Sequence, residues 1–263
     1  MTLTPEALAR VIDHTLLQFD PAEDADAQRR RIEALCREAT REGFAAVCVR
    51  PVHAAIARRA LDALQSSAHL AVVIAFPSER AALRRECAHP TFGGAATADK
   101  LAEIAQALAD GADELDIVMN LALFQRERAE SEWTQTAREW RALTQAAAGR
   151  PVKLILETDW HNPDDIAPLC RLAAECGVAM VKTSTGMAID APGATPDIIA
   201  RMGAALAGQS RSVGVKASGG VRSAAQALAL LQAGATRLGT SAGPHLLAQL
   251  RANASTEAIT AAY

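Results

Sequence analysis

Short apolar runs alternate with longer amphipathic segments along the whole chain. Eight runs of five to seven residues are rich in Val, Leu and Ile, a composition typical of strands buried on both faces. They span residues 11–15, 44–49, 70–76, 114–119, 152–158, 178–184, 212–218 and 236–241. Apolar residues recur at helical spacing between them, for example over 22–43, 97–111, 131–149 and 223–234. These four segments end on glycine, as helices often do before the chain turns into a strand.

Strands that alternate with helices pair in parallel through helical crossovers. Eight such units predict an α/β fold with a closed (β/α)8 barrel, a TIM barrel, rather than an open sheet. The G-x-G-x-x-G fingerprint of a dinucleotide-binding sheet does not follow the first strand. No low-complexity linker divides the chain. We therefore expect a single domain over 1–263, with an insertion at the barrel rim near 78–91 and a flexible C-terminal tail near 252–263.

Composition and charge narrow the class of protein. The net charge of −3 argues against binding to nucleic acid, which requires a clustered basic excess, but leaves a small anionic substrate open. Five scattered cysteines without a C-x-x-C pair indicate reduced, buried thiols rather than a metal cluster or a disulfide scaffold. The N-terminal segment holds no long apolar run, so we expect no signal peptide, no membrane span and a cytoplasmic location.

Alternation along the strands sends a set of polar side chains into the barrel. The valines of "SVGVKAS" suit the helix layer, which directs Lys216 inward. The same pattern directs Lys182 and Asp116 inward from their strands, and Asp13 can face inward from the first strand. Because barrel enzymes place their chemistry at the C-terminal ends of the strands, we expect these residues to meet at one mouth.

Lysine is rare in this chain, so its positions carry weight. Arginine supplies most of the 27 basic side chains, and the lysines are Lys100, Lys153, Lys182 and Lys216. The sixth and seventh strands are neighbours in the barrel, so Lys182 and Lys216 should lie close together. For Lys153 we expect a structural role, in a salt bridge with Glu157.

Two close lysines can turn one of them into a nucleophile. A free lysine has a pKa of about 10.4, and at pH 7 fewer than about one molecule in a thousand carries the neutral amine. Burial and a neighbouring cation both disfavour the charged form and can lower the pKa by about 3 units, or roughly 4 kcal/mol. The pair therefore predicts Schiff-base chemistry on a carbonyl carbon, with an aspartate such as Asp116 holding a water and shuttling protons.

Glycine-rich turns follow the seventh and eighth strands and predict a phosphate site. "SGGVRS" (218–223) and "GTSAG" (239–243) lead into helix N-termini, the usual position of a phosphate cradle in barrel enzymes. Glycine lets backbone N–H groups approach an anion closely, although loops are rich in glycine for other reasons as well. The candidate phosphate residues are Gly219, Gly220, Gly239, Ser241 and Arg222, with Gly186 closing the near side, and Thr185 is a further candidate for substrate binding. Arg222 could instead face solvent.

Five motifs in chain order, "VIDHTLL", "GADELDIVMN", "VKTSTG", "GVKASGGVRS" and "RLGTSAG", resemble the class I deoxyribose-phosphate aldolases over most of the chain. The resemblance implies reversible cleavage of 2-deoxy-D-ribose 5-phosphate to acetaldehyde and D-glyceraldehyde 3-phosphate, with no metal and no cofactor. It implies that Lys182 forms the Schiff base, that Lys216 lowers its pKa and that Asp116 shuttles protons. The partners would be a small phosphorylated sugar and acetaldehyde, and the oligomeric state stays open, with a homodimer or homotetramer compatible.

The resemblance also reaches less central positions. It implies that Asp13 and Thr15 hold substrate hydroxyls and that Cys48 lies near the site. Some family members end in a mobile tyrosine that assists proton transfer, and Tyr263, the last residue, either has this role or is a frayed end. Two rim loops depart from the family pattern, because an insertion separates the Phe-Pro after the third strand from its glycines, and "ETDWHNPDD" follows the fifth strand.

Three other functions stay open at this point. One is a Schiff-base aldolase acting on a different sugar phosphate, and another is a barrel that binds sugar phosphates without catalysis. The third is a metal-dependent aldolase, against which no His-x-His or His-Glu-x-x-His spacing is present. We expect His14 to pack outward under a helix rather than to bind metal.

Overall fold

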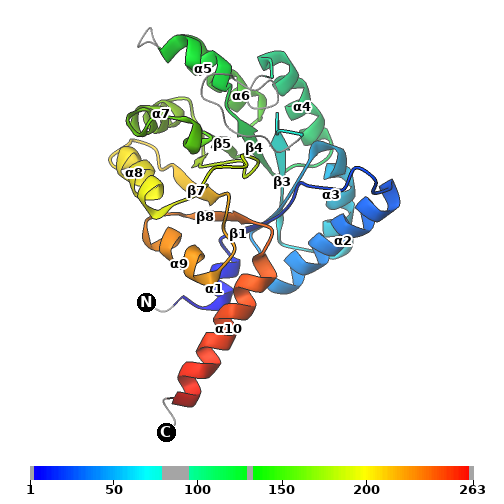
Figure 1. Cartoon of the computed structure of the whole chain (residues 1–263). Coiled ribbons are helices and arrows are strands. Elements are labelled where there is room, and N and C mark those ends of the chain that lie inside the picture. The colour runs from blue at the N-terminus through cyan, green and yellow to red at the C-terminus, as the bar shows by residue number, and fades with distance from the viewer. Residues whose placement is uncertain (1–2, 79–94, 129–132, 261–263) are drawn as a thin grey trace.

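The computed structural model describes residues 3–78, 95–128 and 133–260, and their side chains as far as residue 252. Eight parallel strands close into a barrel in chain order, and β1 pairs with both β2 and β8. Helices surround this ring of strands (Figure 1). The predicted (β/α)8 barrel is confirmed. Most of the expected insertion near 78–91, and Tyr263, lie outside the described residues.

All eight predicted strands are present. They are β1 (Ile12–Leu16), β2 (Ala46–Val49), β3 (His69–Ile74), β4 (Glu114–Val118), β5 (Val152–Ile155), β6 (Met180–Lys182), β7 (Gly214–Ser218) and β8 (Arg237–Thr240). The helices are α1 (Pro5–Ala9), α2 (Ala25–Glu42), α3 (Ala54–Ala63), α4 (Thr97–Ala109), α5 (Leu121–Arg128), α6 (Thr134–Ala146), α7 (Pro163–Glu175), α8 (Pro196–Leu206), α9 (Ala224–Gln232) and α10 (Gly243–Thr260). Two short 3-10 turns are η1 (Pro51–His53) and η2 (Thr158–Trp160).

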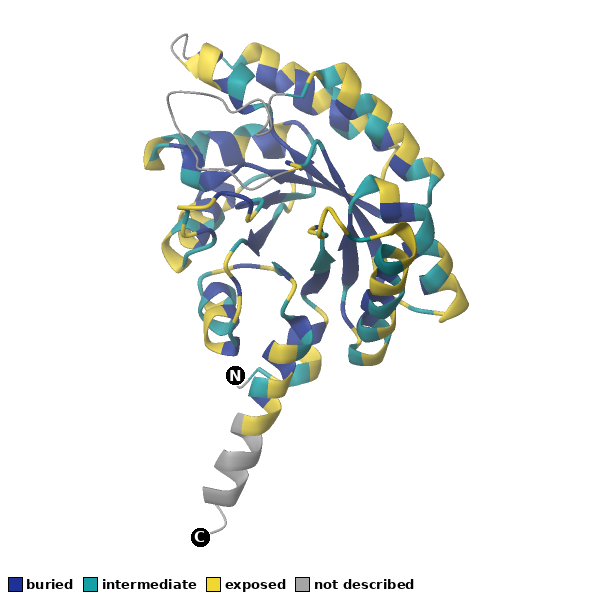
Figure 2. Ribbon diagram, turned by 45° about the vertical axis from the view of Figure 1, so that its right-hand side comes forward, coloured by how far each residue is buried: buried dark blue, intermediate teal, exposed yellow. Residues whose placement is uncertain are grey.

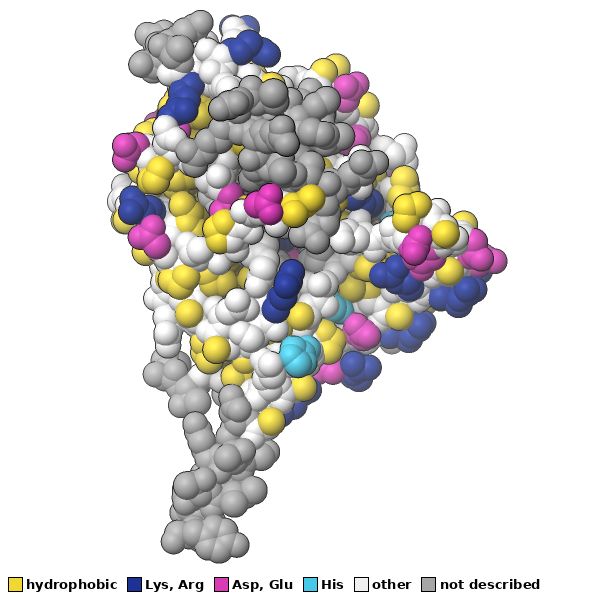
Figure 3. Space-filling view, viewed as in Figure 1, with side chains coloured by type: hydrophobic (Ala, Val, Ile, Leu, Met, Phe, Trp, Pro, Cys, Tyr) yellow, Lys and Arg dark blue, Asp and Glu magenta, His cyan; other side chains and the backbone are white. Residues whose placement is uncertain are grey.

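Helix α2 illustrates how the sequence bounds and orients the outer layer. Asp24 caps its start by accepting the N–H of Ala27 at 2.7 Å, and Gly43 ends it with a φ of 71°. Ile32 and Cys36 are buried in the main core, whereas the arginines of this helix are exposed and add to the dark blue side chains on the right of Figure 3 (Arg29, Arg30, Arg31, Arg37 and Arg41). Figure 2 shows the same division around the barrel, with buried faces toward the strands and exposed faces outward.

The barrel interior is divided into an apolar part and a charged part. Leu17, Ala46, Cys48, Ala71 and Val73 form a small apolar cluster on the side of β2 and β3. Strands β4 to β7 instead carry buried charged side chains, namely Glu114, Asp116, Lys153, Lys182 and Lys216. Because the apolar side chains exclude water from their side, the charged residues meet in a largely dry interior.

The first and last helices of the described chain pack side by side. Helix α1 packs beside α10, which continues through Thr260 and extends beyond the barrel in Figure 1. The expected tail near 252–263 is therefore helical as far as residue 260. No helix in the described ranges is long and apolar enough to cross a membrane.

Candidate active site

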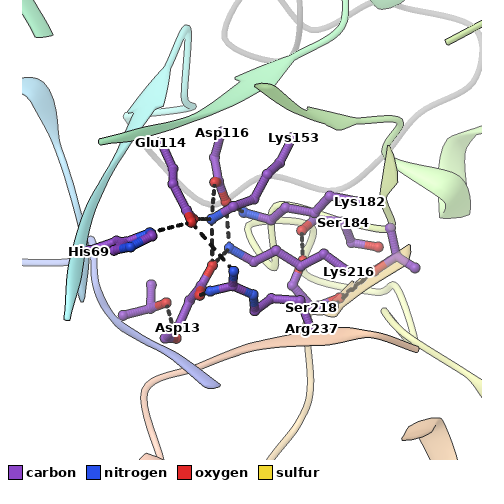
Figure 4. Close-up of polar contacts among 12 residues, drawn as sticks. Asp13, His69, Glu114, Asp116, Lys153, Lys182, Ser184, Lys216, Ser218 and Arg237 are labelled. Atoms are coloured by element: carbon purple, nitrogen blue, oxygen red, sulfur yellow. Dashed lines mark hydrogen bonds and ion pairs between the residues drawn. The ribbon is translucent and has the colours of Figure 1, made fainter. Parts of the chain in front are cut away.

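Two lysines stand side by side at the end of β6 and in β7. Lys182 and Lys216 are direct partners in the register of these strands. Both Nζ atoms donate to Oδ2 of Asp116 on β4 at 2.7 Å, so a single carboxylate oxygen joins the two ammonium groups (Figure 4). The predicted proximity of these three side chains is confirmed.

Further charged side chains join them inside the barrel. Lys153 lies 2.7 Å from Asp13 and also contacts Glu114, and Arg237 lies 2.8 Å from Asp13 and 3.4 Å from Glu114. Lys216 contacts Asp13 as well. We call the seven residues that these contacts connect the interior charge cluster: Asp13, Glu114, Asp116, Lys153, Lys182, Lys216 and Arg237.

The interior charge cluster contains one more cation than anion. Its four basic side chains face three carboxylates, and the partly exposed His69 ring lies 2.8 Å from Glu114 at its edge. Six of the seven side chains are no more than 5% exposed, and Arg237 is 14% exposed. Because an unbalanced charge is costly in a dry interior, the cluster favours the loss of one proton.

Lys182 is the cation whose proton is held least firmly. Burial lowers the pKa of Lys182, Asp116 opposes this shift in part, and Lys216 adds to it, so the pKa lies below its ordinary value. Burial also lowers the pKa of Lys153 and that of Lys216, but their carboxylate neighbours outweigh it and raise both. Three lysines overcome the effect of burial on Asp116 and hold its pKa well below the ordinary value. The neutral amine is therefore most accessible at Lys182.

The predicted salt bridge between Lys153 and Glu157 is wrong. Lys153 lies within β5, level with Asp116 on β4, and its Nζ contacts the cluster carboxylates. Strand β5 ends two residues before Glu157, whose backbone takes a left-handed conformation with φ 54°. The Glu157 carboxylate accepts the N–H of Thr185 with both oxygens, at 3.2 and 3.3 Å. Alternation along a strand therefore does not continue past its last residue.

A cavity of about 470 Å³ opens above the cluster at the C-terminal ends of the strands. Its lining includes Lys182 and eight predicted substrate-binding residues: Thr15, Thr185, Gly186, Gly219, Gly220, Arg222, Gly239 and Ser241. The lining also includes four residues that the sequence analysis did not predict: Gln18, Arg31, Phe76 and Met187. Phe76 and Gln18 follow strand ends, a position that could have indicated them, whereas Arg31 lies inside α2, where no local signal marks it.

Asp13 and Cys48 lie beneath this cavity rather than in its wall. Asp13 is the second residue of β1, fully buried, and both its oxygens accept from cationic partners. The structure thus places Asp13 in the interior charge cluster, and its expected contact with substrate hydroxyls stays a prediction. Cys48 is fully buried in the apolar part of the barrel, so it lies near the lysines without lining the cavity.

Glycine is needed at these cavity positions for two different structural reasons. Gly186, Gly219 and Gly220 have φ values of 76°, 87° and 78°, which other residues rarely adopt. Gly239 instead leaves room for Lys216, because a Cβ there would lie 3.1 Å from Lys216 Cε. The positive φ values of the first three glycines are compatible with an anion-binding loop, whereas Gly239 leaves space for the Lys216 side chain.

Three remaining expectations concern residues away from the cavity. His14 Nε2 lies 2.8 Å from Glu38 on α2 and its ring packs against Phe44, so the predicted outward packing is confirmed. The four described cysteines are free and buried. Among the residues that the structure describes, no group of three or more His, Cys, Asp or Glu side chains is placed to hold a metal ion.

Comparison with known proteins gives a consistent set of relatives. A model of the DeoC/LacD family aldolases matches residues 8–247. The chain is 39% identical over 248 residues to deoxyribose-phosphate aldolase 1 of Bacillus licheniformis, covering 94% of this chain and 97% of the relative. It is 37% identical to deoxyribose-phosphate aldolase 1 of Cutibacterium acnes, covering 92% and 97%. The tetrameric deoxyribose phosphate aldolase structure from Aeropyrum pernix superimposes with a TM-score of 0.76 at 30% identity, covering 94% and 92%.

Charge balance in the cluster can be tested with Asp13→Asn, which removes an anion at almost constant volume. The variant leaves four cations with two carboxylates, so we expect it to lower the free energy of unfolding at pH 7 by about 3–5 kcal/mol. Urea denaturation measures the change. Asp197→Asn, at a side chain that is 75% exposed on α8, is the matched control and should change stability by less than about 0.5 kcal/mol. Equal stability of the two variants would contradict a role for charge balance.

Glu157 predicts a pH dependence of stability. Burial raises its pKa from 4.5 to about 7, so the folded state disfavours its ionisation. The favourable contribution of protonated Glu157 to the free energy of unfolding is complete below about pH 4.5 and is lost as the pH rises through 7. Glutamine does not ionise, so between about pH 5 and 8 the unfolding free energy of Glu157→Gln should fall less than that of the wild type, by up to about 3 kcal/mol. Denaturation at several pH values tests this against the exposed control Glu175→Gln; parallel curves for Glu157→Gln and the wild type would refute it.

Proposed function

The chain belongs to the DeoC/LacD family of aldolases, and we propose that Lys182 is the amine on which its chemistry proceeds. It is a class I aldolase that reversibly cleaves 2-deoxy-D-ribose 5-phosphate to acetaldehyde and D-glyceraldehyde 3-phosphate through a lysine Schiff base. One observation supports Lys182 above the other lysines of the cluster. It lines the cavity and has a lowered pKa, whereas Lys153 and Lys216 are buried below with raised pKa values.

The cleavage then proceeds in four steps. The neutral Nζ of Lys182 adds to the C1 aldehyde carbon of the open-chain sugar, and loss of water gives an iminium. A base takes the proton of the C3 hydroxyl, the C2–C3 bond breaks, and its electron pair forms an enamine while D-glyceraldehyde 3-phosphate leaves. Protonation at C2 restores the iminium. Addition of water then releases acetaldehyde and the free lysine.

Asp116 is proposed to orient the amine and carry protons. Its Oδ2 accepts from Lys182 at 2.7 Å, which fixes the direction of the nitrogen. The same oxygen accepts from Lys216, whose charge keeps the carboxylate ionised. When Lys182 becomes neutral, one of the cations that depress the pKa of Asp116 is lost, so the carboxylate becomes a better proton acceptor as attack begins.

The phosphate end of the sugar is assigned to the glycine loop after β7. Gly219 and Gly220 line the same cavity as Lys182, and α9 begins a few residues later with Ser223 as its N-cap. A helix N-terminus and exposed N–H groups favour a dianion. Arg222 and Ser241 complete the proposed phosphate site, and Thr185 with Gly186 closes it from the β6 side.

Three wider proposals rest on the relatives and the sequence. Tyr263 is a candidate for proton transfer at the enamine carbon, as the family resemblance implies. A homo-oligomer is proposed because the Aeropyrum pernix relative is described as tetrameric. A cytoplasmic location fits the phosphorylated substrate and the free cysteines of the described residues.

Reductive trapping tests the identity of the nucleophile. With acetaldehyde and sodium borohydride, an ethyl group should become attached to Lys182 and be found there by peptide mass spectrometry. Lys182→Arg keeps a cation but cannot deprotonate, so both labelling and cleavage should disappear. Labelling of Lys153 or Lys216 in the wild-type protein would show that the assignment is wrong.

Replacing Lys216 tests the electrostatic control of Lys182. In Lys216→Leu the cluster has three cations and three carboxylates, so Lys182 no longer carries an excess charge and its pKa should rise. We expect cleavage at pH 7 to fall by at least about tenfold and its optimum to move to higher pH. A pH profile of kcat/KM measures this, with Lys216→Arg as the variant that keeps the charge. An unchanged profile in Lys216→Leu would contradict this electrostatic role.

A further inference from the structure

The turn between β5 and α7 carries a carboxylate that the reaction does not use. Asp159 lies in η2, within the "ETDWHNPDD" segment that departs from the family pattern. Its Oδ2 accepts the hydroxyl of Ser184 at 3.3 Å and the backbone N–H of Gly193 at 3.1 Å. These two residues stand near the start and the end of the connection from β6 to α8. A single oxygen therefore holds both ends of that connection together.

Gly193 brings the β6–α8 connection into contact with the proposed phosphate-binding loop. Its φ is 72°, and a Cβ at this position would lie 2.4 Å from the carbonyl oxygen of Gly219. The next residue, Ala194, donates its N–H to the same carbonyl oxygen at 3.1 Å. The backbone of the connection is thus pressed directly against the backbone of the proposed phosphate-binding loop.

The same connection contacts the phosphate-binding loop at two other points. A Cβ on Gly186 would lie 3.4 Å from the Cα of Gly219, and a Cβ on Gly220 would lie 3.2 Å from the carbonyl oxygen of Pro192. Residues 186 and 192 both belong to the connection that Asp159 holds. The positions of Gly219 and Gly220 therefore depend on that connection along its length.

We propose that Asp159 is a positioning residue that sets the affinity for the phosphate group by holding residues 184–193 against Gly219 and Gly220. The proposal rests on the phosphate site described above and deepens it. Asp159 does not line the cavity, so it acts through the backbone rather than by touching the sugar. It is also distinct from the interior charge cluster, whose contacts do not include it.

Two variants test this role. Asp159→Ala removes the acceptor of both hydrogen bonds, so we expect KM for 2-deoxy-D-ribose 5-phosphate to rise about tenfold while kcat stays within about twofold. Inhibition by inorganic phosphate should weaken by a similar factor. The rate of borohydride trapping with acetaldehyde, which has no phosphate, should not change. Asp159→Asn keeps an oxygen acceptor for the Gly193 N–H and should recover most of the affinity.

The controls separate this proposal from the others. Asp190→Ala removes an exposed carboxylate from the same connection and should leave all three measurements unchanged. If Asp159→Ala does not fold, Ser184→Ala removes only one of the two contacts, and a smaller rise in KM is expected. An unaltered KM and phosphate inhibition in a folded Asp159→Ala, or an equal loss of acetaldehyde trapping, would overturn the proposal. Failure of the wild-type protein to be trapped on Lys182 would instead count against the proposed nucleophile and leave this comparison intact.

Discussion

An excess of one cation over the carboxylates enclosed in the barrel is the constraint on which the site depends. Within the interior charge cluster the cations differ in how many carboxylates they contact. Lys153 contacts three, Lys216 and Arg237 contact two each, and Lys182 contacts only Asp116. Since each carboxylate contact favours the protonated form, the excess charge is relieved where the contacts are fewest. That position is also the one that borders the cavity, so the amine that loses its proton is the amine that an aldehyde can reach.

Closure of the barrel is what makes this arrangement possible. Asp13 and Lys216 are 203 positions apart in the chain, and Lys153 is 140 positions from Asp13. The pairing of β1 with β8 closes the ring, so that Asp13 of β1 meets Lys153 of β5 and Lys216 of β7 inside the barrel. The opposite wall, formed by small and apolar side chains such as Ala71 and Cys48, contributes low polarity instead of charge. A dry wall beside the cluster strengthens every interaction within it.

The sequence predicts the position of those site residues that lie within the regular alternation of a strand. Alternation along the strands correctly directed Lys182, Lys216 and Asp116 into one interior, because strand register turns spacing into position. The expected salt bridge between Lys153 and Glu157 is wrong, since β5 ends before Glu157 and the backbone there turns left-handed. The sequence also put Asp13 at the mouth, because alternation along a strand does not say how deep in the barrel a residue lies. The contacts of Asp159 join segments 25 and 34 residues apart through loops, which have no repeat that could indicate them.

The two halves of the site place different demands on the fold. The pKa of Lys182 is set by side chains on strands, which the main apolar core between strands and helices holds in place. The proposed phosphate site lies on loops, whose positions depend on a few hydrogen bonds and close glycine contacts. Buried charges in place of apolar residues lower stability, so the interior charge cluster is retained at a cost that the outer core must offset. The interior charge cluster lies on strands, whereas the proposed phosphate site lies on loops. Substitutions in the loops can therefore change the substrate preference without disturbing the charge balance that lowers the pKa of Lys182.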